Sequence, residues 1–175
     1  ILFPNGDPGL LDDDDRRRVV TAHNGAECHR ILDELKPDII AVYGTAVLKP
    51  ETIRKAGTVM LNMHTGISPR YRGTDTVFWP LHNEEPEWVG VTIHVLDEGI
   101  DTGPILAVGK PQFEADDDEY TLFAKCVRVG AELYVDALRE ALEGRIQGDP
   151  QQLSDGASYR GVDRTVFASR KVEKL

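Results

Sequence analysis

Two apolar runs, PDIIAVYG at residues 37–44 and TVMLNMH at residues 58–64, constrain the fold of this chain more than any other feature. The first run is bounded by Pro and Gly, as is typical of a strand buried in a parallel sheet. The segment KPETIRKAG between the two runs has Pro50 near its start and Gly57 after its end, which predicts a short helix. A strand, a helix and a strand in this order predict an α/β fold with a parallel sheet. Ligands of such sheets bind outside the carboxyl ends of the strands.

Other segments extend this pattern. Residues 17–23 are expected to form a short strand, and residues 25–36 have the apolar spacing of a helix. Apolar and polar residues alternate over residues 89–98, which predicts a strand with two different faces. Residues 103–114 follow a turn that contains Gly, and they predict a further strand that pairs with the one before it.

The longest predicted helix covers about residues 119–144, and a shorter helix is expected at residues 75–83. Asp118 is expected to be the N-cap of the long helix, because an acidic side chain suits the positive end of a helix. Apolar residues that recur every three or four positions predict a stripe that faces the core. The stripe consists of Tyr120, Phe123, Val127, Ala131, Tyr134, Leu138 and Ala141.

The tail has few periodic apolar residues, so we expect one domain over residues 1–145 and a carboxy-terminal extension or arm over residues 146–175. Within this tail, YRGVDRT at residues 159–165 could be an ordered return of the chain or an extended arm. The chain does not begin with Met and carries no recognisable signal peptide. We therefore expect an upstream part of the domain to be absent from the sequence.

Composition excludes several classes of protein. The net charge of −10 disfavours nucleic acid as a partner, because binding to phosphates draws on Lys and Arg. No apolar run approaches the roughly 18 residues of a membrane span. Cys28 and Cys126 are far apart, and we expect two buried thiols in a reducing cytoplasm. The acidic runs at residues 11–15 and 114–119 are typical of solvated loops, so no metal is expected.

The run TVMLNMH ends on two polar residues, Asn62 and His64. Residues i and i+2 of a strand share a face and lie roughly 7 Å apart, so both side chains point the same way at the carboxyl end of the strand. They could be a catalytic pair or two polar groups that only cap the next loop. Further along, Asp97, Glu98 and Asp101 lie in a turn, and a carboxylate there could orient an imidazole.

Several catalytic motifs are missing from the sequence. It contains no GxSxG nucleophile motif, no GxGxxG and no GxxxxGK[ST]. An Asn, a His and an Asp together offer a donor for a carbonyl oxygen, a second donor or acid, and a carboxylate to balance charge. These residues favour a direct acyl-type transfer over covalent catalysis.

The segment NMHTGISPRYRG, followed further along by GVTIHVLDEGIDTGPIL, resembles the folate-dependent formyltransferase family. That family includes glycinamide ribonucleotide formyltransferase, the catalytic domain of methionyl-tRNA formyltransferase, and sugar-amine formyltransferases. The resemblance covers residues 37–143. It implies a Rossmann-like, three-layer α/β fold with a mostly parallel open sheet and flanking helices, from which the amino-terminal part of the family's domain is missing.

The resemblance also implies roles for individual residues. The catalytic Asn, His and Asp of the family fall on Asn62, His64 and Asp101, and the co-substrate is 10-formyltetrahydrofolate. The residues expected to bind this folate are Tyr43, Gly44, Val47, Leu48, Leu96, Asp97, Glu98, Gly99 and Ile100. The residues expected to bind the acceptor are Thr65, Gly66, Arg70, Arg72 and Gly73.

The acceptor is expected to be a primary amine on a small molecule, either a nucleotide-linked amino sugar or glycinamide ribonucleotide. Thr65 and Gly66 replace the residues that usually follow the His, and Arg70 and Arg72 could hold an anionic acceptor or be solvated. A homodimer is possible. Two alternatives remain: a hydrolase of 10-formyltetrahydrofolate, and a folate-binding or interaction module without catalysis. His94 could support the site or be an ordinary buried histidine.

The expected chemistry follows from the charge that develops during transfer. An amine that attacks the formyl carbon places negative charge on the formyl oxygen, to which Asn62 and a protonated His64 can donate hydrogen bonds. One such donor is typically worth ~3 kcal/mol of barrier. Asp101 would stabilise the His64 cation, so the pKa of His64 is expected to lie above roughly 6.5.

Overall fold

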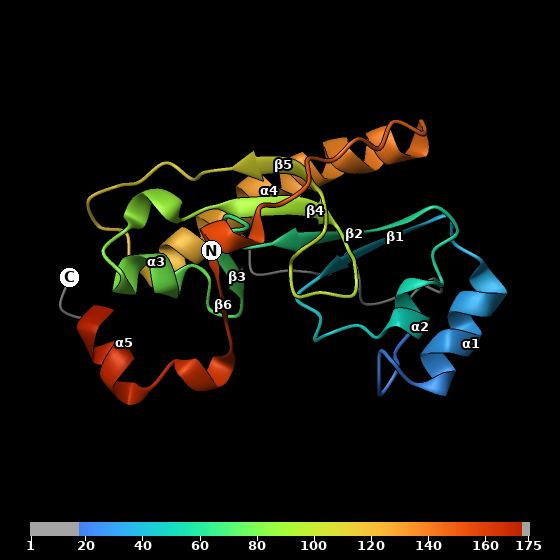
Figure 1. The fold of residues 1–175 in the computed structure, drawn as a ribbon, viewed down its shortest axis with the longest axis horizontal. Helices are drawn as coiled ribbons and strands as arrows, with labels where there is room; N and C mark the ends of the chain where they lie inside the picture. The colour runs from blue at the N-terminus through green and yellow to red at the C-terminus, as the bar shows by residue number, and fades with distance from the viewer. Residues whose placement is uncertain (1–17, 173–175) are drawn as a thin grey trace, which may run out of the picture.

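The computed structural model describes residues 18–172, so the acidic run at residues 11–15 lies outside the described residues. Strands β1 (Ile39–Tyr43), β2 (Val59–His64), β4 (Val91–Val95) and β5 (Ile105–Gly109) form one sheet in the order β1-β2-β4-β5 (Figure 1). β1 and β2 are parallel, whereas β4 is antiparallel to both β2 and β5. The α/β class with flanking helices is as predicted, but the described sheet is mixed rather than mostly parallel.

The mixed topology has a simple cause. Parallel neighbours need a crossover connection, and the helix α2 (Pro50–Ile53) lies in the crossover between β1 and β2. β4 and β5 are joined by a turn, which forces them to run in opposite directions. No strand forms at residues 18–23, so the strand expected over residues 17–23 is wrong for its described part.

Strand β1 is less buried than its apolar sequence predicts. Ala41 and Tyr43 are exposed, although the run was expected to lie in the middle of a sheet. In the part of the sheet that the structure describes, β1 has a neighbour on one side only, which is β2. Helix α1 (Ala26–Leu35) lies near the β1 end of the sheet in Figure 1, and Leu35 of its expected apolar side is exposed.

The core lies between the sheet and the long helix α4 (Glu119–Leu142), which packs against all four strands. Alternate residues of β2 and β4 point toward α4 and are buried there with Ala137 and Ala141. These strand residues are Val59, Leu61, Met63, Val91 and Ile93. The residues between them, which include Asn62, His64, Thr92 and His94, therefore face the opposite side of the sheet.

Helix α4 begins as predicted but faces the core with a different stripe. Asp118 caps it by accepting a hydrogen bond from the backbone N–H of Thr121 at 2.8 Å. Tyr120 is 76% exposed, Phe123 is 40% exposed and Ala131 is exposed as well, so the expected stripe is wrong at these three positions. The buried residues of α4 are Leu122, Cys126, Gly130, Ala137 and Ala141. The apolar pattern does not predict burial of Gly130, because glycine is not counted as an apolar residue. Its burial has a steric reason, since a side chain there would collide with Met63 and Val91.

The tail returns to the rest of the molecule. Strand β6 (Ala157–Tyr159) pairs in parallel with β3 (Tyr71–Gly73), and helix α5 (Val166–Val172) packs against α3 (Phe78–His82). The described part of the chain also contains three short 3-10 helices: η1 (Pro86–Trp88), η2 (Leu153–Asp155) and η3 (Gly161–Asp163). The segment YRGVDRT is thus an ordered return. The domain boundary near residue 145 stays a prediction.

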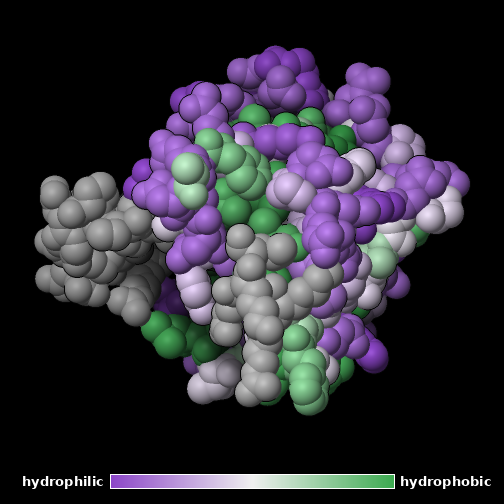
Figure 2. Space-filling view, turned by 90° about the vertical axis from the view of Figure 1, so that its left-hand side faces the viewer, coloured by the Kyte–Doolittle hydropathy of each residue, from purple (hydrophilic) through white to green (hydrophobic). Residues whose placement is uncertain are grey.

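The end of the molecule that carries α3 and α5 faces the viewer in Figure 2, where apolar surface lies among polar surface. Val166 and Phe167 of α5 are 69% and 81% exposed. Both cysteines are free; Cys126 is buried as expected, and Cys28 is only partly buried. Among the described residues, no helix has the length and apolar character needed to cross a membrane.

Candidate active site

A cleft of about 670 Å³ opens where β1 and β2 end and where the turn after β4 begins. Its walls come from the loop after β1, the end of β2, the turn after β4, and residues brought in from β3 and β6. The lining residues are Tyr43, Gly44, Thr45, Ala46, Val47, Leu48, Asn62, Met63, His64, Thr65, Gly73, Thr74, Asp75, Thr76, His94, Leu96, Asp97, Gly99, Ile100, Asp101, Phe123, Tyr159, Arg160 and Gly161. A cleft of this size suits a small-molecule ligand.

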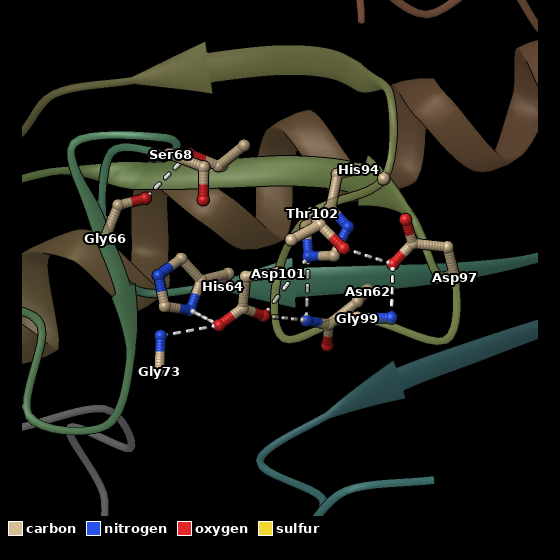
Figure 3. A network of polar contacts seen from close by, with 12 residues as sticks. Asn62, His64, Gly66, Ser68, Gly73, His94, Asp97, Gly99, Asp101 and Thr102 are labelled. Carbon is tan, nitrogen blue, oxygen red and sulfur yellow. Dashed lines mark hydrogen bonds and ion pairs between the residues drawn. The ribbon is translucent and has the colours of Figure 1, made fainter. Parts of the chain in front are cut away.

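Asn62, His64 and Asp101 meet in this cleft (Figure 3). The Nδ2 atom of Asn62 donates to Oδ1 of Asp101 at 3.2 Å, and Nδ1 of His64 lies 3.4 Å from Oδ2 of the same carboxylate. One carboxylate thus joins the two polar residues at the end of β2. The predicted convergence of the three side chains is what the structure has, while their catalytic roles stay proposals.

The turn after β4 holds Asp101 in a left-handed backbone conformation, with φ at 51°. Asp tolerates this region better than most residues, because its short polar side chain can form local hydrogen bonds. Asp97 braces the turn by accepting a hydrogen bond from Thr102 Oγ1 at 2.7 Å. The backbone N–H of Gly73 donates to Asp101 Oδ2 at 2.8 Å, and Gln151 Nε2 donates to the Asp101 carbonyl at 2.9 Å. The carboxylate is therefore fixed at several points.

The pKa of Asp101 lies below its ordinary value. Burial alone would raise this pKa, but the contacts with His94 and His64 and the hydrogen bond from the Gly73 N–H lower it by more. Asp101 is therefore a carboxylate at neutral pH, and it places one negative charge in the cleft.

His64 is buried, with 6% of its side chain exposed. Its Nε2 lies 2.9 Å from the carbonyl oxygen of Tyr71; because a carbonyl only accepts, Nε2 carries the hydrogen. Burial lowers the pKa of His64 below its ordinary value, and the nearby charge of Asp101 offsets this only in part. The expectation of a raised pKa is therefore wrong, because loss of hydration outweighs the carboxylate. The neutral ring presents the Nδ1 lone pair on the side of Asp101.

The loop after β2 passes close over His64, and this requires a glycine. A Cβ atom at Gly66 would collide with His64 Nε2 and come 2.7 Å from the Cβ of Thr76. Thr92 of β4 ties down the same loop, because its Oγ1 donates to the Gly66 carbonyl at 2.7 Å and accepts from the Ser68 N–H at 3.1 Å. Gly66 thus contacts His64 from behind and does not line the cleft.

His94 contacts the same network, and a role for it in supporting the site stays a proposal. It is 1% exposed and lies opposite Asn62 in the β2–β4 register. Its Nε2 is 3.1 Å from Asn62 Nδ2 and 3.4 Å from Asp101 Oδ1. The alternation of residues 89–98 already placed His94 on the polar face of its strand, but the pairing partner of that strand was needed to see what it contacts.

Most residues expected to bind folate line the cleft, with one exception. Glu98 is exposed and lies 3.6 Å from Arg54. The residues that do line it are Tyr43, Gly44, Val47, Leu48, Leu96, Asp97, Gly99 and Ile100.

The residues expected to bind the acceptor divide differently. Thr65 and Gly73 line the cleft, whereas Arg70 and Arg72 do not. Arg70 donates two hydrogen bonds to Glu85, at 2.5 and 3.3 Å, and Arg72 Nε donates to the Pro69 carbonyl at 3.3 Å.

Sequence reasoning missed the part of the cleft that the carboxy-terminal return supplies. Tyr159 and Arg160 line the cleft although they are about 60 residues from Asp101 in the chain. Tyr159 stacks on Trp79, with ring centroids 4.5 Å apart, and on Tyr71 at 5.7 Å. The segment YRGVDRT is compatible with an ordered return, but nothing local to it indicates its pairing with β3. Among the described residues, no group of three or more metal-ligating side chains is placed to hold a metal ion.

The fold and the site define an α/β protein with an Asn, a His and an Asp converging in one cleft. The chain belongs to the formyl transferase family, whose model matches residues 14–138. Methionyl-tRNA formyltransferase of Caldanaerobacter subterraneus subsp. tengcongensis is 33% identical over 142 residues, which are 79% of this chain and 45% of that protein. The enzyme of the same name from Kosmotoga olearia is 36% identical over 138 residues, or 78% of this chain and 43% of that protein. The chain thus spans less than half the length of these two relatives.

Solved structures agree with this family. The formyltransferase PseJ of Anoxybacillus kamchatkensis, solved with UDP-4,6-dideoxy-4-formamido-L-AltNAc and tetrahydrofolate, is 26% identical and has a TM-score of 0.65. The alignment covers 72% of this chain and 66% of that one. A 4-N formyltransferase from Francisella tularensis has a TM-score of 0.65 at 20% identity, with 81% of this chain and 62% of that chain covered, and it shows likeness of fold alone.

Proposed function

We propose that this protein transfers a formyl group from 10-formyltetrahydrofolate to the primary amine of a nucleotide-linked amino sugar. The observation that carries the proposal is the convergence of Asn62, His64 and Asp101 in a cleft of about 670 Å³. Membership of the formyl transferase family supports the reaction class. The acceptor amine forms the new bond to the formyl carbon, and the bond from that carbon to the folate nitrogen breaks, so that tetrahydrofolate leaves with one proton on that nitrogen.

Asn62 is the donor to the formyl oxygen. Negative charge grows on this oxygen as the amine attacks, and an amide N–H that points at it lowers the barrier. In the structure the amide nitrogen of Asn62 is engaged by Asp101 and His94 at 3.2 and 3.1 Å. It is therefore held by the end of β2 at a fixed place in the cleft.

His64 receives the proton that the amine loses. Its lowered pKa keeps the ring neutral at neutral pH, so Nδ1 is available as a base. Once Nδ1 is protonated, the ring donates to Asp101 on one side and to the Tyr71 carbonyl on the other. Asp101 thus stabilises the cation that forms during the reaction, and this role replaces the protonated His64 expected from the sequence.

The other end of the cleft suits the folate. Tyr43, Val47 and Ile100 are 41%, 65% and 42% exposed, which is high for apolar side chains beside a cleft. Such side chains can cover the flat ring of a pterin, and the backbone of the loops after β1 and β4 can bind its polar edge. These residues fit the co-substrate that the family uses.

The acceptor side carries a positive charge. Among the described residues, Arg160 is the one Lys or Arg that lines the cleft, and its side chain is 74% exposed. A guanidinium there can bind the phosphates of a sugar nucleotide. This placement, rather than Arg70 or Arg72, supports an anionic acceptor of small size.

Methionyl-tRNA is the second candidate acceptor. The relatives named as methionyl-tRNA formyltransferases are 33% and 36% identical to this chain, which is higher than the 26% of the sugar enzyme PseJ. The net charge of −10 argues against tRNA, because its phosphates repel an acidic surface.

The test is an assay of the purified protein with 10-formyltetrahydrofolate in three parallel reactions: with an amino-sugar nucleotide, with methionyl-tRNA, and without an amine. We expect tetrahydrofolate to appear together with the formylated sugar nucleotide, identified by mass spectrometry, in the first reaction only. Equal release of tetrahydrofolate without amine would identify a hydrolase. Formylation of methionyl-tRNA alone would establish the second candidate.

A further inference from the structure

We propose that His94 is a positioning residue for formyl transfer, whose Nε2 atom fixes the direction in which the Asn62 amide group points. This inference rests on the proposed function. His94 is 1% exposed on β4, and the strand register places it directly opposite Asn62. Figure 3 shows both side chains beside Asp101, and all three residues line the cleft.

The backbone determines which nitrogen of His94 carries the hydrogen. Its Nδ1 lies 2.8 Å from the carbonyl oxygen of Val95, and a carbonyl only accepts hydrogen bonds. The hydrogen of the neutral ring is therefore on Nδ1. Nε2 is then an acceptor, and it lies 3.1 Å from the Nδ2 atom of Asn62. The carbonyl of Val95 thus turns His94 into an acceptor that faces Asn62.

Two acceptors then determine the orientation of the Asn62 amide. A reversed amide would place Asn62 Oδ1 against the lone pair of His94 Nε2 and against the Asp101 carboxylate, and three acceptors would face one another. With Nδ2 on that side, both contacts of Asn62 join a donor to an acceptor, and the amide N–H group separates two acceptors, His94 Nε2 and Asp101 Oδ1, that lie 3.4 Å apart. His94 and Asp101 together therefore keep the amide nitrogen, rather than the amide oxygen, at this place in the cleft.

The proposal also assigns one N–H of Asn62 to the substrate. Asn62 Nδ2 lies 3.1 Å from His94 Nε2 and 3.2 Å from Asp101 Oδ1. The two acceptors are 3.4 Å apart, so the three atoms form a nearly equilateral triangle. Seen from Nδ2, the two acceptors are closer in direction than the two N–H bonds of a planar amide, and the proposal assigns both acceptors to one of these hydrogens. The second hydrogen points away from them, and it is the one that can reach the formyl oxygen.

Two substitutions of His94 test this role. In His94→Asn the shorter side chain reaches only the position of Nδ1, so the contact with Val95 is kept and the contact with Asn62 is lost. In His94→Gln the longer side chain places its amide at the position of Nε2. We expect kcat to fall about 10-fold in His94→Asn with KM for the folate within about 2-fold, and to recover most of this loss in His94→Gln.

A matched control comes from the neighbouring residue of the same strand. Ile93 is fully buried, but it points toward α4 and away from the cleft. Ile93→Val should lower the melting temperature without changing kcat. If kcat falls in Ile93→Val as well, the loss of kcat in the His94 variants could be due to lower stability alone. An unchanged kcat in His94→Asn would overturn the inference. Equal losses of kcat in His94→Asn and His94→Gln, with the melting temperature of the wild type in both, would also overturn the inference.

A second measurement does not depend on activity. The two Nδ2 hydrogens of Asn62 can be assigned by NMR from the pair that disappears in Asn62→Ala. We expect one of them to exchange slowly with solvent in the free protein and the other quickly, and the slow one to become fast in His94→Asn. Equal, fast exchange of both in the wild type would overturn the inference. Protection of one hydrogen in a protein that transfers no formyl group would uphold the orientation by His94 and reject the proposed function.

Discussion

The wall of the cleft made by β2 and the turn after β4 is buried and joined by hydrogen bonds, whereas the wall made by residues 159–161 is exposed. On the first wall, the side chains of His64 and Asp101 are 6% and 13% exposed, and one carboxylate contacts both His64 and Asn62. On the second, Arg160 is 74% exposed and lies 3.7 Å from Asp163. Tyr159 holds this wall in place through ring stacking and the pairing of β6 with β3.

Under the proposed function, the difference between the two walls corresponds to two tasks. Groups that stabilise charge in a transition state need fixed positions and low exposure to water, because reorganisation at the moment of reaction would cost rate. Groups that bind an anionic acceptor can stay solvated, because a guanidinium retains its charge there and attracts phosphates from a distance. We therefore expect substitutions on the first wall to change kcat and substitutions on the second to change the KM of the acceptor.

The largest effect is expected from Asn62→Ala. Removing a donor to developing negative charge should lower kcat by about 100-fold while donor affinity changes little, because the interaction strengthens in the transition state. The matched control is Asn83→Ala, behind the other wall. Asn83 donates to the hydroxyls of Tyr71 and Tyr159 at 3.0 and 3.2 Å, so it supports the return without facing the cleft. The kcat of Asn83→Ala should stay within about 3-fold of the kcat of the wild type.

Steady-state kinetics and folate binding by calorimetry measure both variants. Near-normal turnover in Asn62→Ala would remove this residue from the mechanism. Equal losses of kcat in the two variants would contradict the division of tasks between the walls.

The two walls also differ in how much of them the sequence predicts. The i, i+2 spacing places Asn62 and His64 on one face of β2, and the turn that contains Asp101 follows the next strand of the sheet. Local sequence patterns therefore suffice to predict the first wall. The position of Tyr159 depends on the pairing of β6 with β3, which is a contact between residues more than 80 positions apart. Three-residue strands carry too few positions for a periodic pattern, so no local signal indicates this pairing.

The same distinction explains the errors in the fold. The direction of β4 depends on which strand it pairs with, and its own alternation is the same in a parallel or an antiparallel sheet. The exposure of Ala41 and Tyr43 depends on the neighbours of β1 and not on its apolar sequence. The pKa of His64 was expected to rise because an acidic residue was visible in the sequence, whereas the burial that lowers it is visible only in the structure.

A second large effect is expected where the two walls meet, at Gly73. This residue has φ at 92°, and a Cβ atom there would collide with the carbonyl oxygen of Tyr159. Gly144 has φ at 71° and nothing within 4 Å of the same added atom. Gly144→Ala should therefore cost only the backbone strain, about 1 kcal/mol, and Gly73→Ala about 2–3 kcal/mol because the return must also move.

Denaturant unfolding of both variants measures this difference. Gly73→Ala should also raise the KM of the acceptor, because the displaced return carries Arg160. If both variants lose the same free energy of unfolding, the contact between Gly73 and Tyr159 does not hold the return.

A smaller effect is expected from Arg160→Ala. Removing one phosphate contact at an exposed site should raise the KM of a sugar-nucleotide acceptor about 10-fold and leave kcat nearly unchanged. The effect should shrink as salt is added, because ions screen exposed charges. Arg70→Ala is the matched control, since Arg70 pairs with Glu85 outside the cleft. A larger rise in KM from Arg70→Ala than from Arg160→Ala would show that Arg70, as expected from the sequence, binds the acceptor in place of Arg160.

The smallest expected effect is a shift in pH dependence, and it separates the two possible states of His64. Since its pKa lies below the ordinary value of roughly 6.5, the neutral base is present at neutral pH, and kcat should fall only as the pH drops through the lowered pKa. The raised pKa expected from the sequence would instead make activity fall as the pH rises above it. Asp101→Asn removes the charge that favours the imidazolium, so it should move the acid limb of the profile to still lower pH, besides slowing the reaction.

Stability should follow the same linkage. The unfolded chain protonates His64 near pH 6.5 and the folded protein only at lower pH, so the free energy of unfolding falls as the pH drops from about 6.5 to the folded pKa. Asp101 has a lowered pKa as well, so its contribution is present above its unfolded pKa of about 3.9 and is lost as the pH falls through the folded value. In Asp101→Asn the loss linked to His64 should be larger, because the difference between its two pKa values grows. An NMR titration of His64 in both proteins, beside their pH–rate curves, measures this directly. A pKa of His64 at or above 6.5 in the wild type would restore the imidazolium as a donor to the formyl oxygen and reject its role as the base.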